Sequence, residues 1–388
     1  MLATLTGLST FGSAASVHAQ SWPFWGGDLR NSHFAANETT ISPANVARLA
    51  PKWTYSTLGN VYAIPTVQDG RVYMLDGGVP LLAGWPGGLL RALDASTGQQ
   101  IWSRSVSDYN FDLVRNLSRT SPAIAGDLLV IGDNRNEPAS LLDIGQTGSS
   151  VYAIDRATGT LVWKTVVETH PLSVITQSPV VYKGRIYVGV SSLEEAAARL
   201  LYPCCTFRGS MVALDLHSGQ ILWKTYTVPD NFGQPTGYAG GAVWGSSPPI
   251  DEKRNVVYIA TGNDYHLPNA LDRCLKAHAG DPQAQQSQCY GPLDSPTNYA
   301  FSVLALDLDT GAIRWAQKLQ NYGAWTLACD PKFAPWLPAN PAGCQNMDGL
   351  DFDFGQSPML YTTPGGKDLV AVGQKSGIFW AFDPDANG

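Results

Sequence analysis

The chain has 388 residues, of which 44% are hydrophobic and 15% charged, so it can bury a large core and is not intrinsically disordered. Its 39 Gly, 26 Pro, 12 Trp, 16 Tyr and 12 Phe favour a turn-rich all-β fold over a helical bundle. The net charge of −7, with no cluster of Lys or Arg, argues against binding to nucleic acid or to anionic lipid.

The first nineteen residues carry no charged side chain and are rich in Leu, Ala, Ser and Thr. They end in Ser16-Val17-His18-Ala19, which predicts a secretory signal peptide over residues 1–19, cleaved after Ala19. No later stretch offers about 18 uninterrupted apolar residues, the length that a membrane span needs. We therefore expect a periplasmic or secreted mature protein, residues 20–388, without a membrane span.

One pattern repeats along the chain: Ala, an apolar residue, Asp, then Ser or Thr followed by Gly, and a Trp eight residues after the Asp. Four copies align without gaps, and a fifth begins near the end of the sequence; their Asp residues are Asp94, Asp155, Asp215, Asp307 and Asp383. The pattern predicts a hairpin in which the Asp carboxylate accepts the N–H groups of the turn and the Gly adopts a left-handed backbone.

A second signature precedes each copy, a Ser-Pro pair or its equivalent followed by a turn and a β-branched strand. The pairs begin at Ile64, Ser121, Ser178, Ser247 and Ser357. The repeat Asp residues are 61, 60, 92 and 76 positions apart, whereas four short strands with their turns need only about 40 residues. We therefore predict an all-β fold, a β-propeller of four-stranded blades. The fifth copy reaches Gly388 within a turn, so we expect further blades to complete the ring.

The six cysteines allow 15 pairings in principle. Cys274 and Cys289 are fifteen residues apart, as are Cys329 and Cys344, in stretches rich in Pro, Gly and Gln that favour disulfide-closed surface loops. The remaining pair, Cys204 and Cys205, is adjacent and can form only a vicinal ring. The absence of C-x-x-C, C-x-x-C-H and H-E-x-x-H excludes thioredoxin-like chemistry, covalent c-type haem and a zincin site in this sequence.

These repeats, together with the stretches 204–210 (Cys-Cys-Thr-Phe-Arg-Gly-Ser) and 244–248 (Trp-Gly-Ser-Ser-Pro), resemble the quinoprotein alcohol dehydrogenases. Members of this family are eight-bladed propellers that hold pyrroloquinoline quinone (PQQ) over a metal ion. The similarity runs from about Trp22 to Gly388 and is greatest to the polyvinyl-alcohol dehydrogenase branch. It implies oxidation of a secondary or polymeric alcohol to a carbonyl. Because no haem motif is present in these residues, it also implies that the electrons pass to an external cytochrome c or to a domain that follows the end of this sequence.

The resemblance also implies a calcium or lanthanide site with hard oxygen ligands. Glu194 follows the matching strand end and is the expected carboxylate ligand, with Glu195 as the alternative register. Asn263 ends the strand that supplies the amide ligand. In the Asp-aromatic motif we expect Asp351 as the general base and Asp353 as a third carboxylate facing the metal, although a shift of two residues would make Asp353 the base.

PQQ is flat and anionic, so it needs an aromatic plate and cations at its edge. By resemblance, Trp244 is that plate, and its position outside the Asp-to-Trp spacing argues against a role in joining blades. Lys375 corresponds to the residue at the quinone oxygens, and further cofactor contacts are expected from Arg119, Thr176, Ser191, Cys204, Cys205 and Arg208. The cysteine pair, however, lies one blade later than the ring that covers PQQ in methanol-oxidising members, and Arg208 can equally lie near the rim.

Two other functions remain compatible with the sequence. One is a non-catalytic propeller that serves as a protein-binding scaffold, since a fold does not fix a function. The other is a different PQQ enzyme, such as a sugar dehydrogenase. The scaffold does not require Glu194, Asn263, Asp351 and Lys375 to converge beside Trp244, whereas an enzyme does.

Overall fold

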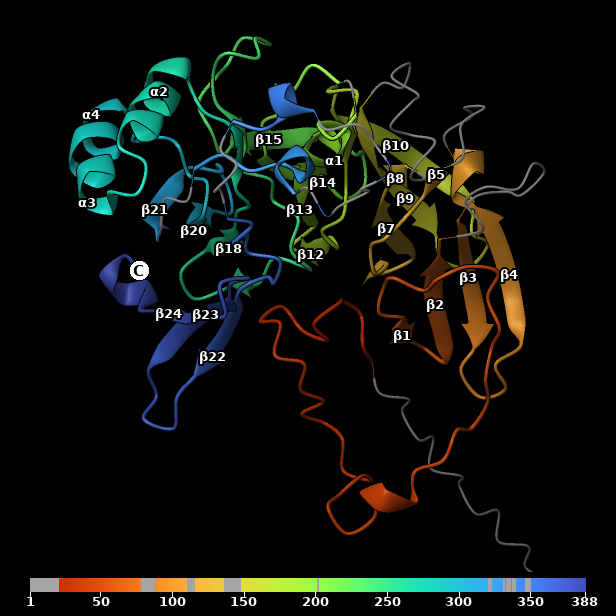
Figure 1. Ribbon diagram of the computed structural model, residues 1–388. Coiled ribbons are helices and arrows are strands. Elements are labelled where there is room, and N and C mark those ends of the chain that lie inside the picture. The colour runs from red at the N-terminus through yellow and green to blue at the C-terminus, as the bar shows by residue number, and fades with distance from the viewer. Residues whose placement is uncertain are drawn as a thin grey trace, which may run out of the picture.

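The computed structural model describes residues 21–77, 88–109, 116–135, 148–200, 202–319, 323–330, 332, 336, 340–345 and 350–388. The expected signal peptide, residues 1–19, lies outside this part of the chain. Five antiparallel sheets follow one another along the sequence and fan around a common centre (Figure 1). No helix in the described part is long and apolar enough to cross a membrane.

Each sheet is a meander of consecutive strands. The first contains β1 (Thr66–Gln68), β2 (Arg71–Asp76), β3 (Leu89–Asp94) and β4 (Gln100–Ser105). The second contains β6 (Ala123–Ala125), β7 (Leu128–Gly132), β9 (Ser149–Asp155) and β10 (Leu161–Glu168). The third contains β12 (Val180–Tyr182), β13 (Arg185–Ser192), β14 (Ser210–Asp215) and β15 (Ile221–Tyr226), and β11 (Ser173–Val174) pairs with one end of β13.

The fourth sheet contains β17 (Ile250–Asp251), β18 (Val256–Ala260), β20 (Ser302–Asp307) and β21 (Ile313–Lys318). The fifth contains β22 (Met359–Thr362), β23 (Asp368–Gly373) and β24 (Phe379–Phe382). Two small ribbons pair β5 (Asn116–Leu117) with β8 (Asn134–Arg135), and β16 (Ala239–Gly240) with β19 (Asp264–His266).

The helices are short and lie in the loops. They are α1 (Glu194–Ala197), α2 (Asn269–Ala277), α3 (Pro282–Ala284), α4 (Gly291–Leu293), the π-helical turn η4 (Gln285–Tyr290) and the 3₁₀ turns η1 (Val46–Arg48), η2 (Val106–Tyr109), η5 (Leu327–Cys329), η6 (Pro341–Gly343) and η7 (Pro384–Ala386). The predicted disulfides Cys274–Cys289 and Cys329–Cys344 close two of these loops, and Cys204 is bonded to Cys205.

The hydrophobic core is divided into layers between successive sheets. Alternate residues of one strand enter different layers: Leu129 of β7 packs toward the first sheet, whereas Val130 packs toward the third. The same alternation sends Tyr258 of β18 toward the fifth sheet and Val257 toward the third. Because both faces of a sheet are buried, the strands read as continuous apolar runs. The predicted β-propeller of four-stranded blades is confirmed.

The repeated tryptophans join each blade to the next. Trp102 of β4 donates its indole N–H to the carbonyl of Arg156 (3.2 Å), and Trp163 of β10 donates to the carbonyl of Leu216 (3.0 Å). The corresponding pairs in the other blades are Trp53 with Ala95 and Trp223 with Leu308. Every acceptor is the residue directly after a repeat Asp. The Trp at the end of one blade therefore binds the turn of the following blade.

The turns have the geometry that the repeat predicts. Hydrogen bonds from Ser96 and Thr97 to the Asp94 carboxylate lower the pKa of Asp94 to about 2. The turn glycines Gly98, Gly159, Gly219 and Gly311 have φ between 70° and 74°. At Gly219 a Cβ atom would lie 2.6 Å from the Trp163 indole, so this glycine is required both by the backbone and by the neighbouring blade.

The Ser-Pro signature links the blades near the centre of the fan. The backbone N–H of Ile64 donates to Ser121 Oγ (3.0 Å), and that of Ser121 donates to Ser178 Oγ (2.9 Å). Ser247 N donates to Ser357 Oγ in the same way, at 2.7 Å. The hydroxyls of Ser121, Ser178 and Ser357 thus each accept an N–H group at the start of the preceding blade. Ser247 differs, because the N–H of Ser178 donates to the backbone carbonyl of Ser246 (2.6 Å).

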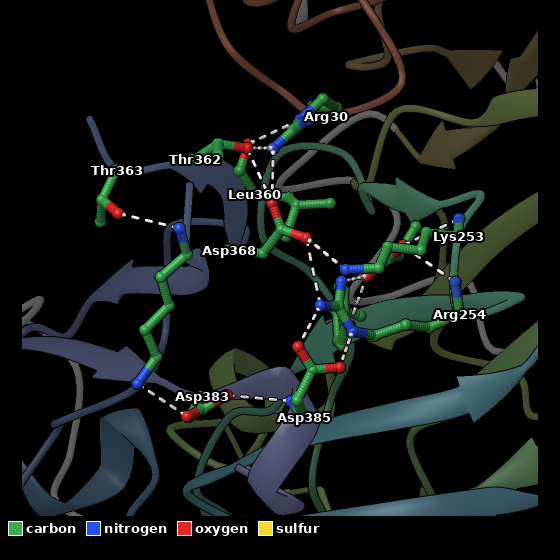
Figure 2. Close-up of polar contacts among 12 residues, drawn as sticks. Arg30, Lys253, Arg254, Leu360, Thr362, Thr363, Asp368, Asp383 and Asp385 are labelled. Atoms are coloured by element: carbon green, nitrogen blue, oxygen red, sulfur yellow. Dashed lines mark hydrogen bonds and ion pairs between the residues drawn. The ribbon is translucent and has the colours of Figure 1, made fainter. Parts of the chain in front are cut away.

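A network of ion pairs joins the fourth and fifth blades at the turn of β17 and β18 (Figure 2). Arg254 contacts Asp251 (2.7 Å), Asp368 (3.1 Å) and Asp385 (2.6 Å), and its side chain is 12% exposed. Arg30 from the N-terminal segment donates to the carbonyl of Leu360. Several partly buried charges that share one arginine hold these segments more firmly than isolated surface pairs would.

The blade junction gives a matched prediction. Gly219→Ala should lower the free energy of unfolding by about 2–4 kcal/mol, because the methyl group meets the Trp163 indole in a left-handed backbone. Gly184→Ala, in the same blade, has φ 71° but open space around the new methyl group, and should lower it by only about 1 kcal/mol. Urea unfolding of both variants measures the difference, and equal losses would contradict the role of the Trp contact.

Candidate active site

A cavity of about 190 Å³ is lined by residues from loops and strand ends of four successive blades. Six residues expected at the site line it: Arg119, Thr176, Ser191, Trp244, Asp353 and Lys375. They span more than 250 positions of the sequence, and the fan of blades brings them together. Of the four residues whose convergence beside Trp244 would favour an enzyme, Lys375 lines the cavity, whereas Glu194, Asn263 and Asp351 are not among its lining residues. Asp351 contacts Lys375, and the Asn263 backbone contacts Asp353.

Trp244 and Lys375 form one wall of the cavity. The Lys375 ammonium lies 5.1 Å from the centre of the Trp244 ring, within the range of a cation–π contact. Trp244 donates its indole N–H to Asp353 Oδ2 (3.0 Å) rather than to the turn of a neighbouring blade. It is thus distinct from the tryptophans that join blades. A flat aromatic face with a cation beside it suits a planar anionic ligand.

The two acids of the Asp-aromatic motif lie in different environments. Asp353 is buried, and its Oδ1 accepts the backbone N–H of Asn263 (2.7 Å) while Oδ2 accepts Trp244. The Asp351 side chain is 34% exposed, and its carboxylate accepts Lys375 Nζ at 2.6 Å. Asp353 is therefore fixed by hydrogen bonds to both oxygens, whereas Asp351 is not a lining residue of the cavity and is joined to it through the Lys375 ammonium, which donates to Asp351 Oδ1.

Burial and neighbouring charges shift the pKa values of these groups. Burial raises the pKa of Asp353 to about 6, with a further contribution from Asp351 and opposition from Lys375. Burial, then Asp353 and Asp351, raises the pKa of Glu195 well above its usual range. Burial acts against the charge of Lys375, but the two aspartates outweigh it and raise the pKa of Lys375. A bound cation would stabilise the ionised form of these crowded acids.

Asn263 contributes a buried acceptor without a partner. Its Nδ2 donates to the carbonyls of Asp264 (2.9 Å) and Trp325 (2.6 Å), which fixes the orientation of the amide. Its Oδ1 is buried and accepts no hydrogen bond from the described residues. A buried carbonyl oxygen left in this way is unfavourable unless a ligand supplies the missing interaction.

Glu194 does not lie at the cavity, contrary to the first register expected from the sequence. Its buried carboxylate accepts the backbone N–H groups of Thr206 (2.7 Å) and Phe207 (2.8 Å), and His170 Nε2 lies 3.4 Å away. Glu195 lines the cavity instead, and no hydrogen bond or ion pair within the described part of the chain reaches its carboxylate. Both residues begin α1, where successive side chains point about 100° apart, so only one of them can face the cavity.

The ligand oxygens of Glu195, Asp351 and Asp353 do not all lie within 4.8 Å of one another. Repulsion between like charges accounts for this spacing. The three acids and the Asn263 amide are all oxygen donors, which is the donor set that calcium and lanthanide ions prefer. The residues present therefore fit a hard cation at this position.

The two hydroxyl residues of the predicted set are neighbours. Thr176 Oγ1 lies 3.0 Å from Ser191 Oγ and donates to the carbonyl of Trp244 (3.2 Å). Arg119 lies over the ring of Tyr62, 5.0 Å from its centre. These contacts hold the three side chains in the cavity wall.

Arg208 and the cysteine pair are placed elsewhere. Arg208 donates to the carbonyl of Val228, forms an ion pair with Asp230 (3.3 Å) and lies over the Tyr226 ring, so the guanidinium is held at the edge of β15. Cys205 is fully buried in the core layer behind the cavity, and neither Cys204 nor Cys205 lines the cavity. These three expected cofactor contacts are therefore not made by the cavity wall.

Tyr265 is a polar aromatic lining residue that the sequence analysis did not anticipate. Tyr265 of β19 lines the cavity, is 4% exposed and stacks on Phe207 with a ring separation of 6.3 Å. Burial, with the charges of Glu195 and Asp353, raises the pKa of Tyr265 well above its usual value, so it remains a neutral phenol. The sequence signal for Tyr265 is its position two residues after Asn263, because alternate residues of a strand lie on the same face.

Comparisons with known proteins identify the family and the fold of this chain. A family profile described as "Outer membrane protein assembly factor BamB" matches residues 45–225 and 142–273, which together exceed half of the chain. Polyvinylalcohol dehydrogenases from Pseudomonas sp and from Sphingopyxis sp. (strain 113P3) are 30% and 31% identical, each over 95% of this chain and 50% of the relative. The chain belongs to the PQQ-dependent alcohol dehydrogenase family.

A solved family structure shows the same fold. The quinohemoprotein alcohol dehydrogenase of Comamonas testosteroni superposes with a TM-score of 0.61 at 20% identity, over 96% of this chain and 48% of that one. The chain thus spans about half the length of the quinoprotein relatives that it matches. Family membership and the propeller fold predicted from the sequence are confirmed.

The raised pKa of Asp353 gives a prediction for the cation-free protein. Because the folded state holds the proton more tightly than the unfolded state, ionisation of Asp353 costs stability as pH rises from about 4 to 6. Asp353→Asn should therefore gain stability relative to wild type over this range, on the order of 2 kcal/mol. Thermal unfolding of both proteins from pH 4 to pH 8, with chelator present, measures the difference. A pH-independent difference would contradict it.

Proposed function

We propose that the protein is a PQQ-dependent alcohol dehydrogenase whose cofactor lies against Trp244 in the cavity. Lys375 and Arg119 would neutralise the anionic edge of PQQ, and Thr176 and Ser191 would supply hydroxyl contacts. Glu195, Asn263 and Asp353 would hold a calcium or lanthanide ion beside it. When bound, PQQ supplies the acceptor for the hydride of the alcohol carbon.

The observation that carries this proposal is the pair of unsatisfied oxygen donors at the cavity. Asn263 Oδ1 is buried without a partner, and the Glu195 carboxylate has none among the described residues. Glu195 lines the cavity with the Trp244 ring and Lys375, and Asn263 lies next to it, because its backbone N–H binds the lining residue Asp353. A scaffold has no need of such a group, because unsatisfied buried acceptors lower the stability of the fold.

Asp351 is the proposed general base. Its carboxylate is 34% exposed and is held on one side by Lys375, which lines the cavity, so its other oxygen can accept the hydroxyl proton of an entering alcohol. Both oxygens of Asp353 already accept hydrogen bonds from the protein, which suits a positioning role better than proton transfer.

The wider function follows from family membership and the relatives' names. We propose a secondary or polymeric alcohol as substrate, an external cytochrome c as electron acceptor, and a periplasmic or secreted location. Reduction of added cytochrome c with secondary alcohols, poly(vinyl alcohol) and sugars as donors would test substrate and acceptor together. Activity confined to sugars would favour the sugar dehydrogenase alternative.

The two adjacent glutamates provide a matched test of the cation site. Glu195→Gln should weaken calcium or lanthanide binding at least about tenfold and leave the melting temperature of the cation-free protein unchanged or higher. Glu194→Gln should lower that melting temperature, because its carboxylate holds two backbone N–H groups of the 204–207 loop. Isothermal titration and thermal unfolding separate these effects. The reverse result would return the ligand role to Glu194.

The base is tested by Asp351→Asn. We expect kcat for dye reduction by the PQQ- and cation-loaded protein to fall about 10²–10⁴-fold, with PQQ affinity nearly unchanged. Asp368→Asn is the control: Asp368 does not line the cavity and belongs to the ion-pair network of Figure 2, so this variant should retain kcat. Undiminished kcat in Asp351→Asn would exclude this base. Failure of the wild-type protein to take up PQQ would favour the scaffold function.

A further inference from the structure

Tyr265 presents a hydroxyl without a protein partner to the cavity. The side chain is almost wholly buried, and its ring packs in the core layer with Phe207 and Ala242. No group within the described residues hydrogen-bonds this hydroxyl. Most buried tyrosines outside the cavity donate to a carbonyl or carboxylate, namely Tyr109, Tyr152, Tyr187, Tyr238 and Tyr258, whereas the hydroxyl of buried Tyr73 also has no hydrogen-bond partner among the described residues.

The position of Tyr265 is fixed by the strand that carries it. β19 pairs with β16, and Asp264 on one side and His266 on the other are held by that ribbon. His266 Nδ1 contacts the carbonyl of Gly237 (2.7 Å), which further fixes the strand. The phenol therefore cannot turn away to find a partner elsewhere, and a core position of this kind would be filled equally well by Phe.

From this placement we infer that Tyr265 donates a hydrogen bond to an oxygen atom of the molecule that binds against Trp244. This inference rests on the proposed function, and the acceptor is an oxygen of the cofactor or of the alcohol. A phenol is a neutral donor at physiological pH, so it can bind a quinone, carboxylate or alcohol oxygen in a cavity that otherwise contains several acids. A donor fixed by packing before the ligand arrives loses little freedom on binding.

The test compares Tyr265→Phe with Tyr187→Phe, which removes the same hydroxyl from a blade position outside the cavity. In the ligand-free protein, Tyr265→Phe should keep or raise the melting temperature, because its hydroxyl has no partner to lose. Tyr187→Phe should lower the melting temperature, because its hydroxyl donates to the carbonyl of Leu308. A lower melting temperature for ligand-free Tyr265→Phe would show a structural role and overturn the inference.

Ligand measurements then identify the acceptor. Titration of PQQ with calcium, followed by quenching of tryptophan fluorescence, should show about tenfold weaker binding to Tyr265→Phe if the acceptor is a cofactor oxygen. Unchanged PQQ affinity with about tenfold lower kcat/KM for the alcohol supports a substrate oxygen. Tyr187→Phe should match wild type in both. If wild type binds PQQ and Tyr265→Phe is unaltered in both, this inference alone fails; if wild type binds no PQQ, the proposed function fails with it.

Discussion

The structure depends on the burial of both faces of every inner sheet. A sheet with two apolar faces must be covered on each side, and here the cover is the next sheet in the chain, as the separate core layers show. The twist of each sheet turns this stack into a fan (Figure 1). The Trp contacts on one side and the Ser-Pro hydrogen bonds near the centre then fix the spacing between blades.

This arrangement also builds the candidate active site. The loops that leave the inner strands face one another across the centre of the fan, so residues far apart in sequence become neighbours. Asn263 N–H binds Asp353, Trp244 binds the same carboxylate, and Lys375 N–H donates to the Asp353 carbonyl (3.0 Å). Asp353 thus connects the fourth and fifth blades at the cavity, and the position of each acid depends on how those blades pack.

The sequence predicted those features that depend on local chemistry. Asp94, Gly98 and the Trp residues each perform a task within one turn or against the adjacent turn, so their spacing survives as a readable repeat. Trp244 and Lys375 were expected at the site by resemblance to the quinoprotein family, and both line the cavity. The blade architecture and much of the cavity wall could therefore be read without coordinates.

Other features depend on tertiary packing and could not be read. Which of Glu194 and Glu195 faces the cavity depends on the rotation of α1 against the 204–207 loop. Two adjacent glutamates in a sequence do not reveal that rotation. The position of Arg208 is decided by its contacts next to β15, where the guanidinium donates to the Val228 carbonyl and pairs with Asp230. Tyr265 is a buried aromatic residue, and only the cavity around its hydroxyl distinguishes it from the other core aromatic residues.

The indole contacts between blades have a direction, and that direction matters for how the protein is made. Each Trp near the end of one blade binds a turn that is translated later, so a newly synthesised blade still has its Trp unbound. When the turn of the next blade folds, its carbonyl accepts the indole N–H of this Trp, and the contacts of the earlier blade are complete. Assembly can therefore advance in the order of synthesis, with only the most recent blade incomplete at any moment.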